Sequence, residues 1–229
     1  PNRRCFAFFH PALVDEPLIF VEVALLKDIP TSIDSILEDK GTGAIDSSEY
    51  STAVFYSISN CQPGLQNISF GNFLIKQVVQ ELQGEFPSIK TFVTLSPISG
   101  LQAWLDTKTD LETPELIDLK NQVNALSFNK EATEEHGHLI KQVVFNYLLQ
   151  AKKGKYPADP VARFHLGNGA YVYQLHTGAD FSEKGLSQSR GAMVNYMYDL
   201  RYIEINHERY AIDGDIEFND KLKSLLLEP

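Results

Sequence analysis

The stretch from residue 52 to residue 82 constrains the fold more than any other part of this sequence. A β-type apolar run, 52–59, leads into a loop at 62–72 that contains Gly64 and Gly71, and apolar residues at helical spacing follow from 73 to 82. A strand, a Gly-containing loop and a helix in this order direct backbone N–H groups and the positive helix end at one point. This pattern suits an anionic ligand such as a phosphate. An ordinary strand–turn–helix connection is the alternative, because the two glycines fit neither a G-x-G-x-x-G motif nor a Walker A loop.

A further apolar run, 89–95, follows the helix and ends at Ser96-Pro97. A strand–helix–strand crossover makes adjacent parallel strands, and ligands of such sheets collect at the carboxyl ends of the strands. The loop at 62–72 and the turn at Ser96 both lie at those ends. The sequence therefore predicts that they lie close together.

Composition limits the kinds of protein that this chain can be. Its 229 residues are 43% hydrophobic, which is enough for one domain with a full core, 1–229. A net charge of −10 argues against a nucleic acid or an anionic membrane as the main partner. No apolar run is long enough to span a membrane. Two widely separated cysteines favour a reduced compartment, and we interpret His136 and His138 as a solvated helix start and not as a metal site.

The remaining pattern predicts a mixed sheet with helices. Strands are expected at 4–9, 18–26, 170–176 and 192–199, and a short capped helix at 33–37. Residues 101–157 are predicted to be a helical insertion, and 218–227 a final amphipathic helix. The predicted class is α+β, with a mixed central sheet flanked by helices.

A few polar residues within these apolar stretches are candidates for chemistry. His165 lies between an apolar stretch and the Asn168-Gly169 turn, and a histidine can exchange a proton near neutral pH, but a lone buried histidine is more often structural. Ser96 ends a strand without the G-x-S-x-G of a hydrolase elbow and, taken alone, fits a turn residue. Asn195 and Tyr198 either reach a site from their strand or pair across the sheet.

Several short stretches, spread in order over residues 3–199, together resemble the catalytic domain of malonyl-CoA decarboxylases. They are Arg3-Arg4-Cys5-Phe6, Glu16-Pro17-Leu18-Ile19, Phe55-Tyr56-Ser57-Ile58-Ser59, Gln62-x-Gly64-Leu65, Gly71-x-Phe73-Leu74-Ile75-Lys76, Leu95-Ser96-Pro97-Ile98-x-Gly100, Pro160-Val161-Ala162-x-Phe164-His165-Leu166-x-Asn168-Gly169-Ala170 and Met193-Val194-Asn195-Tyr196.

The resemblance implies a GNAT-type acyl-CoA transferase fold and a catalytic pair, Ser96 and His165. Asn195 and Tyr198 are candidates to support this pair from their strand. It implies no metal and no organic cofactor, since the CoA thioester is itself the electron sink. Asn67 stands where relatives often have Gly, which affects the fine geometry of the loop. The implied cradle for the pantetheine and pyrophosphate of CoA is Gln66, Asn67, Ile68, Ser69, Phe70, Gly71 and Asn72.

The expected reaction is decarboxylation of malonyl-CoA to acetyl-CoA and CO2, as part of malonyl-CoA turnover in fatty acid metabolism. The resemblance also implies a homo-oligomer formed through an upstream helical domain that this sequence does not include. Two alternatives are a GNAT-type acyltransferase that uses the same CoA site, and a non-catalytic CoA-binding domain. The C-terminus is not a peroxisomal address, which leaves the cytoplasm as the default compartment, or the mitochondrion after removal of a transit peptide.

Overall fold

The computed structural model describes residues 2–13, 15–38, 47–62, 71–107, 113–127 and 129–227. Its strands are β1 (Arg3–Phe9), β2 (Pro17–Leu26), β3 (Thr52–Asn60), β4 (Thr91–Thr94), β5 (Ser96–Pro97), β6 (Lys152–Lys153), β7 (Tyr156–Pro157), β8 (Tyr171–His176) and β9 (Met193–Met197). Its α-helices are α1 (Ile33–Leu37), α2 (Gly71–Glu85), α3 (Leu101–Leu105), α4 (Pro114–Asn124), α5 (Lys130–Glu135), α6 (Gly137–Gln150), α7 (Pro160–Gly167), α8 (Glu183–Ser189) and α9 (Ile203–Asp213). Two short 3-10 helices are η1 (Ser47–Glu49) and η3 (Asp220–Leu225).

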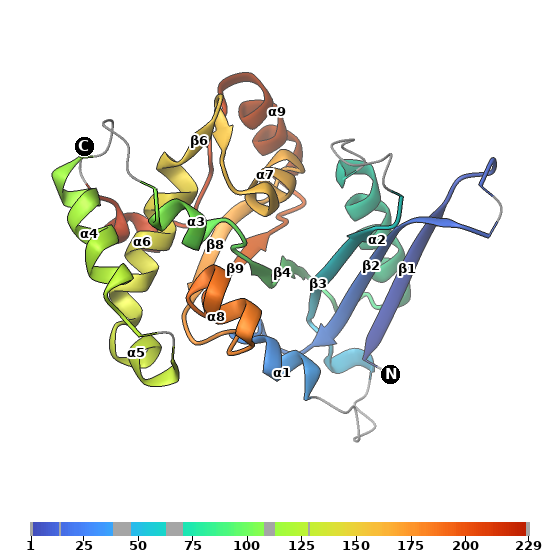
Figure 1. Cartoon of the computed structure of the whole chain (residues 1–229). Helices are drawn as coiled ribbons and strands as arrows, with labels where there is room; N and C mark the ends of the chain where they lie inside the picture. Colours follow the sequence, from blue (N-terminus) through green and yellow to red (C-terminus); the bar gives the residue numbers. More distant parts are fainter. Residues whose placement is uncertain are drawn as a thin grey trace.

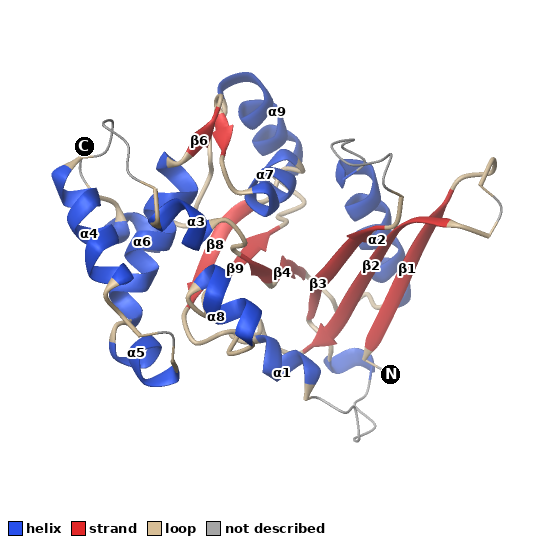
Figure 2. Ribbon diagram, in the orientation of Figure 1, coloured by secondary structure: helices blue, strands red, loops and turns tan. Residues whose placement is uncertain are grey.

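The main sheet is mixed and has the strand order β1-β2-β3-β4-β9-β5, with β8 also paired to β9 (Figure 1). The β3–β4 pair is parallel, as the crossover through α2 predicts, and the other pairs are antiparallel. Helices flank the strands, and α4, α5 and α6 lie together beyond β8 (Figure 2). The α+β class is confirmed. The β3–α2–β4 unit has the strand–helix–strand order expected of the GNAT-type fold that the resemblance implied.

The alternation of side chains along the central strands separates two apolar layers. Ala53, Phe55 and Phe92 face the larger core, where the apolar face of α2 packs against them. Val54 and Val93 face the opposite, smaller core, which includes Ile36 of α1. Because successive strand residues point to opposite faces, the register of these strands decides which polar residues meet which helices.

The structure corrects the prediction for the C-terminal segment. Residues 218–227 do not form an amphipathic α-helix, and the helical part is the 3-10 helix η3. Its buried residues, Leu222 and Leu225, are three apart, which matches the three-residue turn of a 3-10 helix. The side chain of Asn146 on α6 holds this segment, donating to the Leu225 carbonyl at 2.8 Å and accepting from the Leu227 N–H at 3.2 Å.

Besides α7, the two helices α8 and α9 were not predicted. The sequence of α8 is polar and short, with Gly185 inside it, so its periodicity is weak. In α9, Ile205 and Ile212 are exposed, which blurs the apolar stripe that marks a surface helix. Both helices form where tertiary contacts outweigh the local pattern.

The backbone between α7 and β8 can be tested at Gly169, with Gly84 of α2 as a matched control. Gly169 has φ +82°, and a Cβ there would lie 2.2 Å from the Ile203 carbonyl oxygen, whereas a Cβ at Gly84 of α2 would meet nothing within 4 Å. Gly169→Ala should therefore lower the free energy of unfolding by more than about 2 kcal/mol. Gly84→Ala should raise it by about 0.5–1 kcal/mol, because Ala is the better helix former. Urea unfolding of both variants measures this, and equal effects would contradict the assignment.

Candidate functional site

Ser96 lies where the sheet changes its pairing. β4 runs parallel to β3 only as far as the Thr94–Phe55 pair, and the Leu95 N–H still donates to the Phe55 carbonyl at 3.1 Å. The next residues leave β3 and pair with β9, Ser96 opposite Val194. Alternation places Thr94 and Ser96 on the face of the larger core, since Leu95 belongs to the smaller one.

His165 comes to the same face from α7. Asp159 caps the N-terminus of this helix and Pro160 occupies its first turn, a combination that favours helix initiation. Ala162, His165 and Leu166 are the buried residues of the helix, at the three- and four-residue spacing of one face. The imidazole is therefore directed into the core, above the strand residues that precede and follow Leu95.

A chain of hydrogen bonds joins the two predicted residues to two others. Ser96 Oγ lies 3.2 Å from His165 Nε2, and the Tyr198 hydroxyl lies 2.8 Å from His165 Nδ1. Ser96 Oγ donates to Thr94 Oγ1 at 2.9 Å. The Tyr196 ring is stacked on the imidazole, with ring centroids 4.9 Å apart and an interplanar angle of 23°. Both nitrogens of His165 are thus engaged, and one face of its ring is covered.

The burial of this chain fixes its protonation. Ser96 and His165 are each only 4% exposed. Burial lowers the pKa of His165 from 6.5 to about 3, and burial also raises the pKa of Tyr198 well above 10. His165 and Tyr198 are therefore both neutral at physiological pH.

Neutral groups leave one consistent set of donors. Since the Ser96 hydroxyl donates to Thr94, its oxygen accepts from His165, so Nε2 carries the ring proton. His165 Nδ1 then accepts from the Tyr198 O–H. The result is a directed chain in which each O–H or N–H donates to the next group, from Tyr198 through His165 and Ser96 to Thr94.

Asn195, a candidate to support the pair, lies on the other side of β9 from Tyr196. Its amide N–H donates to the Thr94 carbonyl at 2.7 Å, and its oxygen is hydrogen-bonded to His176 Nε2. Asn195 thus holds the backbone of β4 next to Ser96 without touching the Ser96–His165 pair. Ser189 acts similarly on the next segment, accepting from the Ile98 N–H and donating to the Ile98 carbonyl at 3.2 and 3.1 Å.

Sequence reasoning missed Thr94, Tyr196 and Asp159. Thr94 shares a strand face with Ser96 two residues later, and this period was available in the sequence. The N-cap signal Asp159-Pro160 was also present and would have placed His165 on a helix. The stacking of Tyr196 on His165 had no such signal, because it depends on how a helix and a distant strand pack.

The predicted CoA cradle lies mostly outside the described residues. Those that fall outside are Gln66, Asn67, Ile68, Ser69 and Phe70. The backbone of Gly71 and Asn72 begins α2, so the segment does lead into a helix N-terminus after β3, as predicted. Further along α2, Lys76 forms an ion pair with Glu204 of α9.

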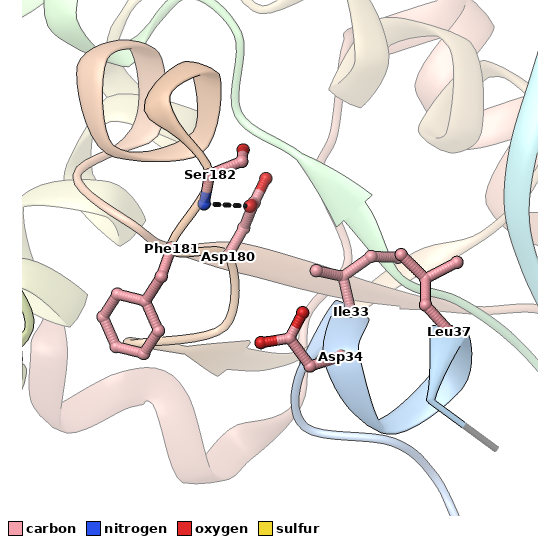
Figure 3. A pocket seen from close by; sticks show the side chains of 6 residues that line it. All are labelled: Ile33, Asp34, Leu37, Asp180, Phe181 and Ser182. Atoms are coloured by element: carbon pink, nitrogen blue, oxygen red, sulfur yellow. Dashed lines mark hydrogen bonds between the residues drawn. The ribbon is translucent and has the colours of Figure 1, made fainter.

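A cavity of about 480 Å³ lies between α1 and the start of α8 (Figure 3), and no residue of the hydrogen-bonded chain lines it. Asp34 and Asp180 give it an acidic character, and the Asp180 carboxylate accepts from the Ser182 N–H at 2.9 Å. No group of three or more metal-ligating side chains occurs among the residues that the structure describes. Among the described residues, no helix is long and apolar enough to cross a membrane.

The comparison with known families gives a match to one family model over residues 1–229, described as malonyl-CoA decarboxylase C-terminal domain. The chain belongs to this family. It is 36% identical to a protein of Anser anser anser named malonyl-CoA decarboxylase, mitochondrial, over 99% of this chain and 50% of that protein.

Two crystal structures named malonyl-CoA decarboxylase are similar to the chain. The protein of Rhodopseudomonas palustris has a TM-score of 0.86 and 46% identity, over 98% of this chain and 56% of that one. The protein of Agrobacterium vitis has a TM-score of 0.86 and 43% identity, over 99% of this chain and 57% of that one. The chain thus spans about half the length of these relatives.

The low pKa of His165 predicts a measurable acid sensitivity. His165 takes up a proton in the unfolded chain near pH 6.5 but not in the folded chain until about pH 3, so the unfolded state binds more protons in between. Stability must therefore fall as the pH falls below about 6.5. Between about pH 7 and about pH 5 this one group should lower the free energy of unfolding by about 2 kcal/mol.

Urea unfolding of the wild type and of His165→Gln at several pH values measures this contribution as the difference between two slopes. The other histidines are present in both proteins and cancel. Parallel slopes over this range would show that His165 is protonated in the folded chain.

Proposed function

We propose that the chain decarboxylates malonyl-CoA to acetyl-CoA and CO2, within malonyl-CoA turnover in fatty acid metabolism. The observation that carries this proposal is the buried hydrogen-bonded chain of Ser96, His165 and Tyr198. These are the two residues of the family's catalytic pair, held together at hydrogen-bond distance, with a third group that orients the imidazole. Family membership supports the substrate, because the relatives are named for it.

The reaction requires groups that stabilise negative charge and a source of one proton. The bond between the carboxylate carbon and the α-carbon breaks, and CO2 leaves. The electron pair of this bond passes into the thioester to give an enolate. A preorganised donor stabilises the enolate oxygen in a site that excludes water. The α-carbon then takes one proton and becomes the methyl group of acetyl-CoA. The thioester accepts the electron pair, so this step uses no metal or organic cofactor.

Ser96 and His165 divide this work. The Ser96 hydroxyl, which donates to Thr94 in the free chain, turns to hydrogen-bond the carboxylate or the thioester oxygen of the substrate and orients it. His165 supplies or relays the proton. As His165 releases its Nε2 proton toward the α-carbon, Nδ1 takes the Tyr198 O–H proton, so an imidazolium, which burial penalises, need not accumulate. Tyr198 then regains its proton, and the reaction as a whole consumes one proton from solvent.

The CoA portion is proposed to bind along the strand–loop–helix unit. Residues 66–72 would hold the pyrophosphate with backbone N–H groups, at the N-terminus of α2. The pantetheine arm would then run toward Ser96, where β4 has left β3 and the parallel pairing has ended. Homo-oligomer formation and a cytoplasmic location stay predictions. For the location, two relatives of the family are named mitochondrial.

Turnover without an acceptor tests the reaction. Purified protein incubated with malonyl-CoA alone should release acetyl-CoA and CO2, and Ser96→Ala and His165→Gln should each lower kcat by about 10²–10³-fold, in the range found for single oxyanion donors. Both variants should bind CoA with unchanged affinity by calorimetry, because the cradle lies elsewhere. A wild-type preparation that binds CoA without turnover would exclude the decarboxylase, and dependence on an added amine or thiol would favour an acyltransferase.

Tyr198→Phe tests the outer end of the hydrogen-bonded chain. It removes the O–H that donates to His165 Nδ1 but keeps the ring, whose centroid lies 6.1 Å from that of Phe55. We expect kcat to fall about 10-fold or more, by analogy with other donors that orient a catalytic histidine. Tyr173→Phe on β8 is the matched control and should leave kcat unchanged. Equal kcat values in the two variants would show that the Tyr198 hydroxyl does not act through His165.

A further inference from the structure

The carboxylate of Asp159 joins the two segments that carry Ser96 and His165. The residue is 1% exposed, and its Oδ1 accepts the N–H groups of Val161 and Ala162, both at 2.9 Å, as the N-cap of α7. Its Oδ2 accepts the N–H of Gly100 at 3.3 Å. Gly100 lies four residues after Ser96, and Asp159 six residues before His165. One rigid side chain thus holds both segments from the same point.

Tyr147 of α6 completes this cluster. Burial raises the pKa of Tyr147, and so does the Asp159 carboxylate to which its hydroxyl is hydrogen-bonded. Tyr147 therefore keeps its proton and donates it. A Cβ at Gly100 would lie 2.2 Å from the Tyr147 oxygen and 3.6 Å from Asp159 Oδ2, so Gly100 provides the space in which hydroxyl and carboxylate meet.

The arrangement exceeds what a helix cap needs. A cap uses one oxygen toward its own helix, and Ser182 and Thr113 cap α8 and α4 in that way. Asp159 uses its second oxygen on a different segment. Burial raises the pKa of Asp159, and the three backbone N–H donors offset only part of this effect. Hydrogen bonds to a carboxylate are stronger than those to a neutral cap, and the two bonds to α7 at 2.9 Å are shorter than the bond to Gly100 at 3.3 Å.

We propose that Asp159 is a positioning residue that sets the separation of Ser96 Oγ and His165 Nε2. The inference rests on the proposed function, because it assigns to Asp159 the geometry that the Ser96–His165 pair needs. A helix of two turns moves as one body, so a shift at its capped end changes the position of the imidazole. A misplacement of about 1 Å can lower a rate about 100-fold.

Two substitutions separate positioning from capping. Asp159→Asn keeps an oxygen for the α7 cap but turns an NH2 group toward the Gly100 N–H, so that donor faces donor. Asp159→Ser also caps the helix but is too short to reach Gly100. Each should lower kcat about 10- to 100-fold with KM within about threefold of wild type, because the CoA cradle is untouched.

Thr113→Ala is the matched control for the loss of a helix cap. Thr113 Oγ1 accepts the Leu116 N–H at 3.3 Å on α4, outside the Ser96–His165 site. Its replacement should lower Tm by about 2–4 °C and leave kcat unchanged. An equal loss of kcat in Thr113→Ala and Asp159→Asn would reduce the role of Asp159 to general stability.

A double substitution tests the geometry of the cluster directly. Gly100→Ala places a methyl group against the Tyr147 hydroxyl and should lower kcat about 10-fold or more, by displacing the cluster. In Gly100→Ala with Tyr147→Phe the nearest atom is the ring carbon at 3.4 Å, an ordinary contact, so most of the lost rate should return. A double variant no better than Gly100→Ala would contradict the arrangement.

A readout independent of turnover separates this inference from the proposed function. The ¹⁵N chemical shifts of the His165 ring report the hydrogen bond between Nε2 and Ser96, and they should change in Asp159→Asn but not in Thr113→Ala. Unchanged shifts with unchanged kcat would overturn the positioning role. If the wild type lacks turnover, the proposed function fails, and the shifts alone decide whether Asp159 sets the geometry.

Discussion

The separation of β4 from β3 at Leu95 is the constraint on which the rest of the site depends. Up to the Phe55–Thr94 pair β4 is parallel to β3 and also pairs with β9 at Val93–Met197, and after Leu95 only the pairing with β9 continues. This change places a short polar segment, and not a further apolar one, under α7. The serine is then fixed from several sides at once: by the Thr94 hydroxyl, by β9 through the pairing with Val194, and by Ser189 through Ile98, two residues later. Alteration of the pairing would move all of these contacts together.

The buried polar chain is stable because almost all of its groups have partners. An unpaired hydroxyl or imidazole in such a place would cost about 1–3 kcal/mol, but here the O–H and N–H groups of Tyr198, His165 and Ser96 each donate to the next group. Thr94 is central to this hydrogen bonding. Its hydroxyl oxygen accepts from Ser96 and from the Tyr196 N–H, so it joins the two strands that the site spans. The site is therefore part of the core, and its rigidity comes from the same contacts as the stability of the sheet.

Much of this arrangement was predictable from the sequence, because it depends on local patterns. The strands, the parallel crossover and helix α2 follow from periodicity, and the family motifs identified Ser96 and His165. The contact between Ser96 and His165 could not be derived from periodicity, because 69 residues separate them in sequence and only the packing of α7 on the sheet brings them together. Tyr198 was predicted beside the pair from its strand position, and its contact with Nδ1 needed the structure. For Asn195 the sequence left two alternatives, reaching the site or pairing across the sheet, and the structure shows it bonded to the Thr94 carbonyl of the neighbouring strand.

The depressed pKa of His165 favours a particular kind of proton chemistry. A decarboxylation begins with an anionic carboxylate and passes through an enolate, so a permanently charged imidazolium beside the substrate would stabilise the starting carboxylate as well as the transition state, and such uniform binding gains no rate. A neutral imidazole avoids this. In the proposed reaction it offers a fixed N–H dipole, and its proton would move only when the enolate carbon, a far stronger base than a carboxylate, is present. Under that proposal, burial in an apolar layer tunes when the proton is delivered, and the hydrogen bond from Tyr198 keeps the ring in the tautomer that the delivery needs.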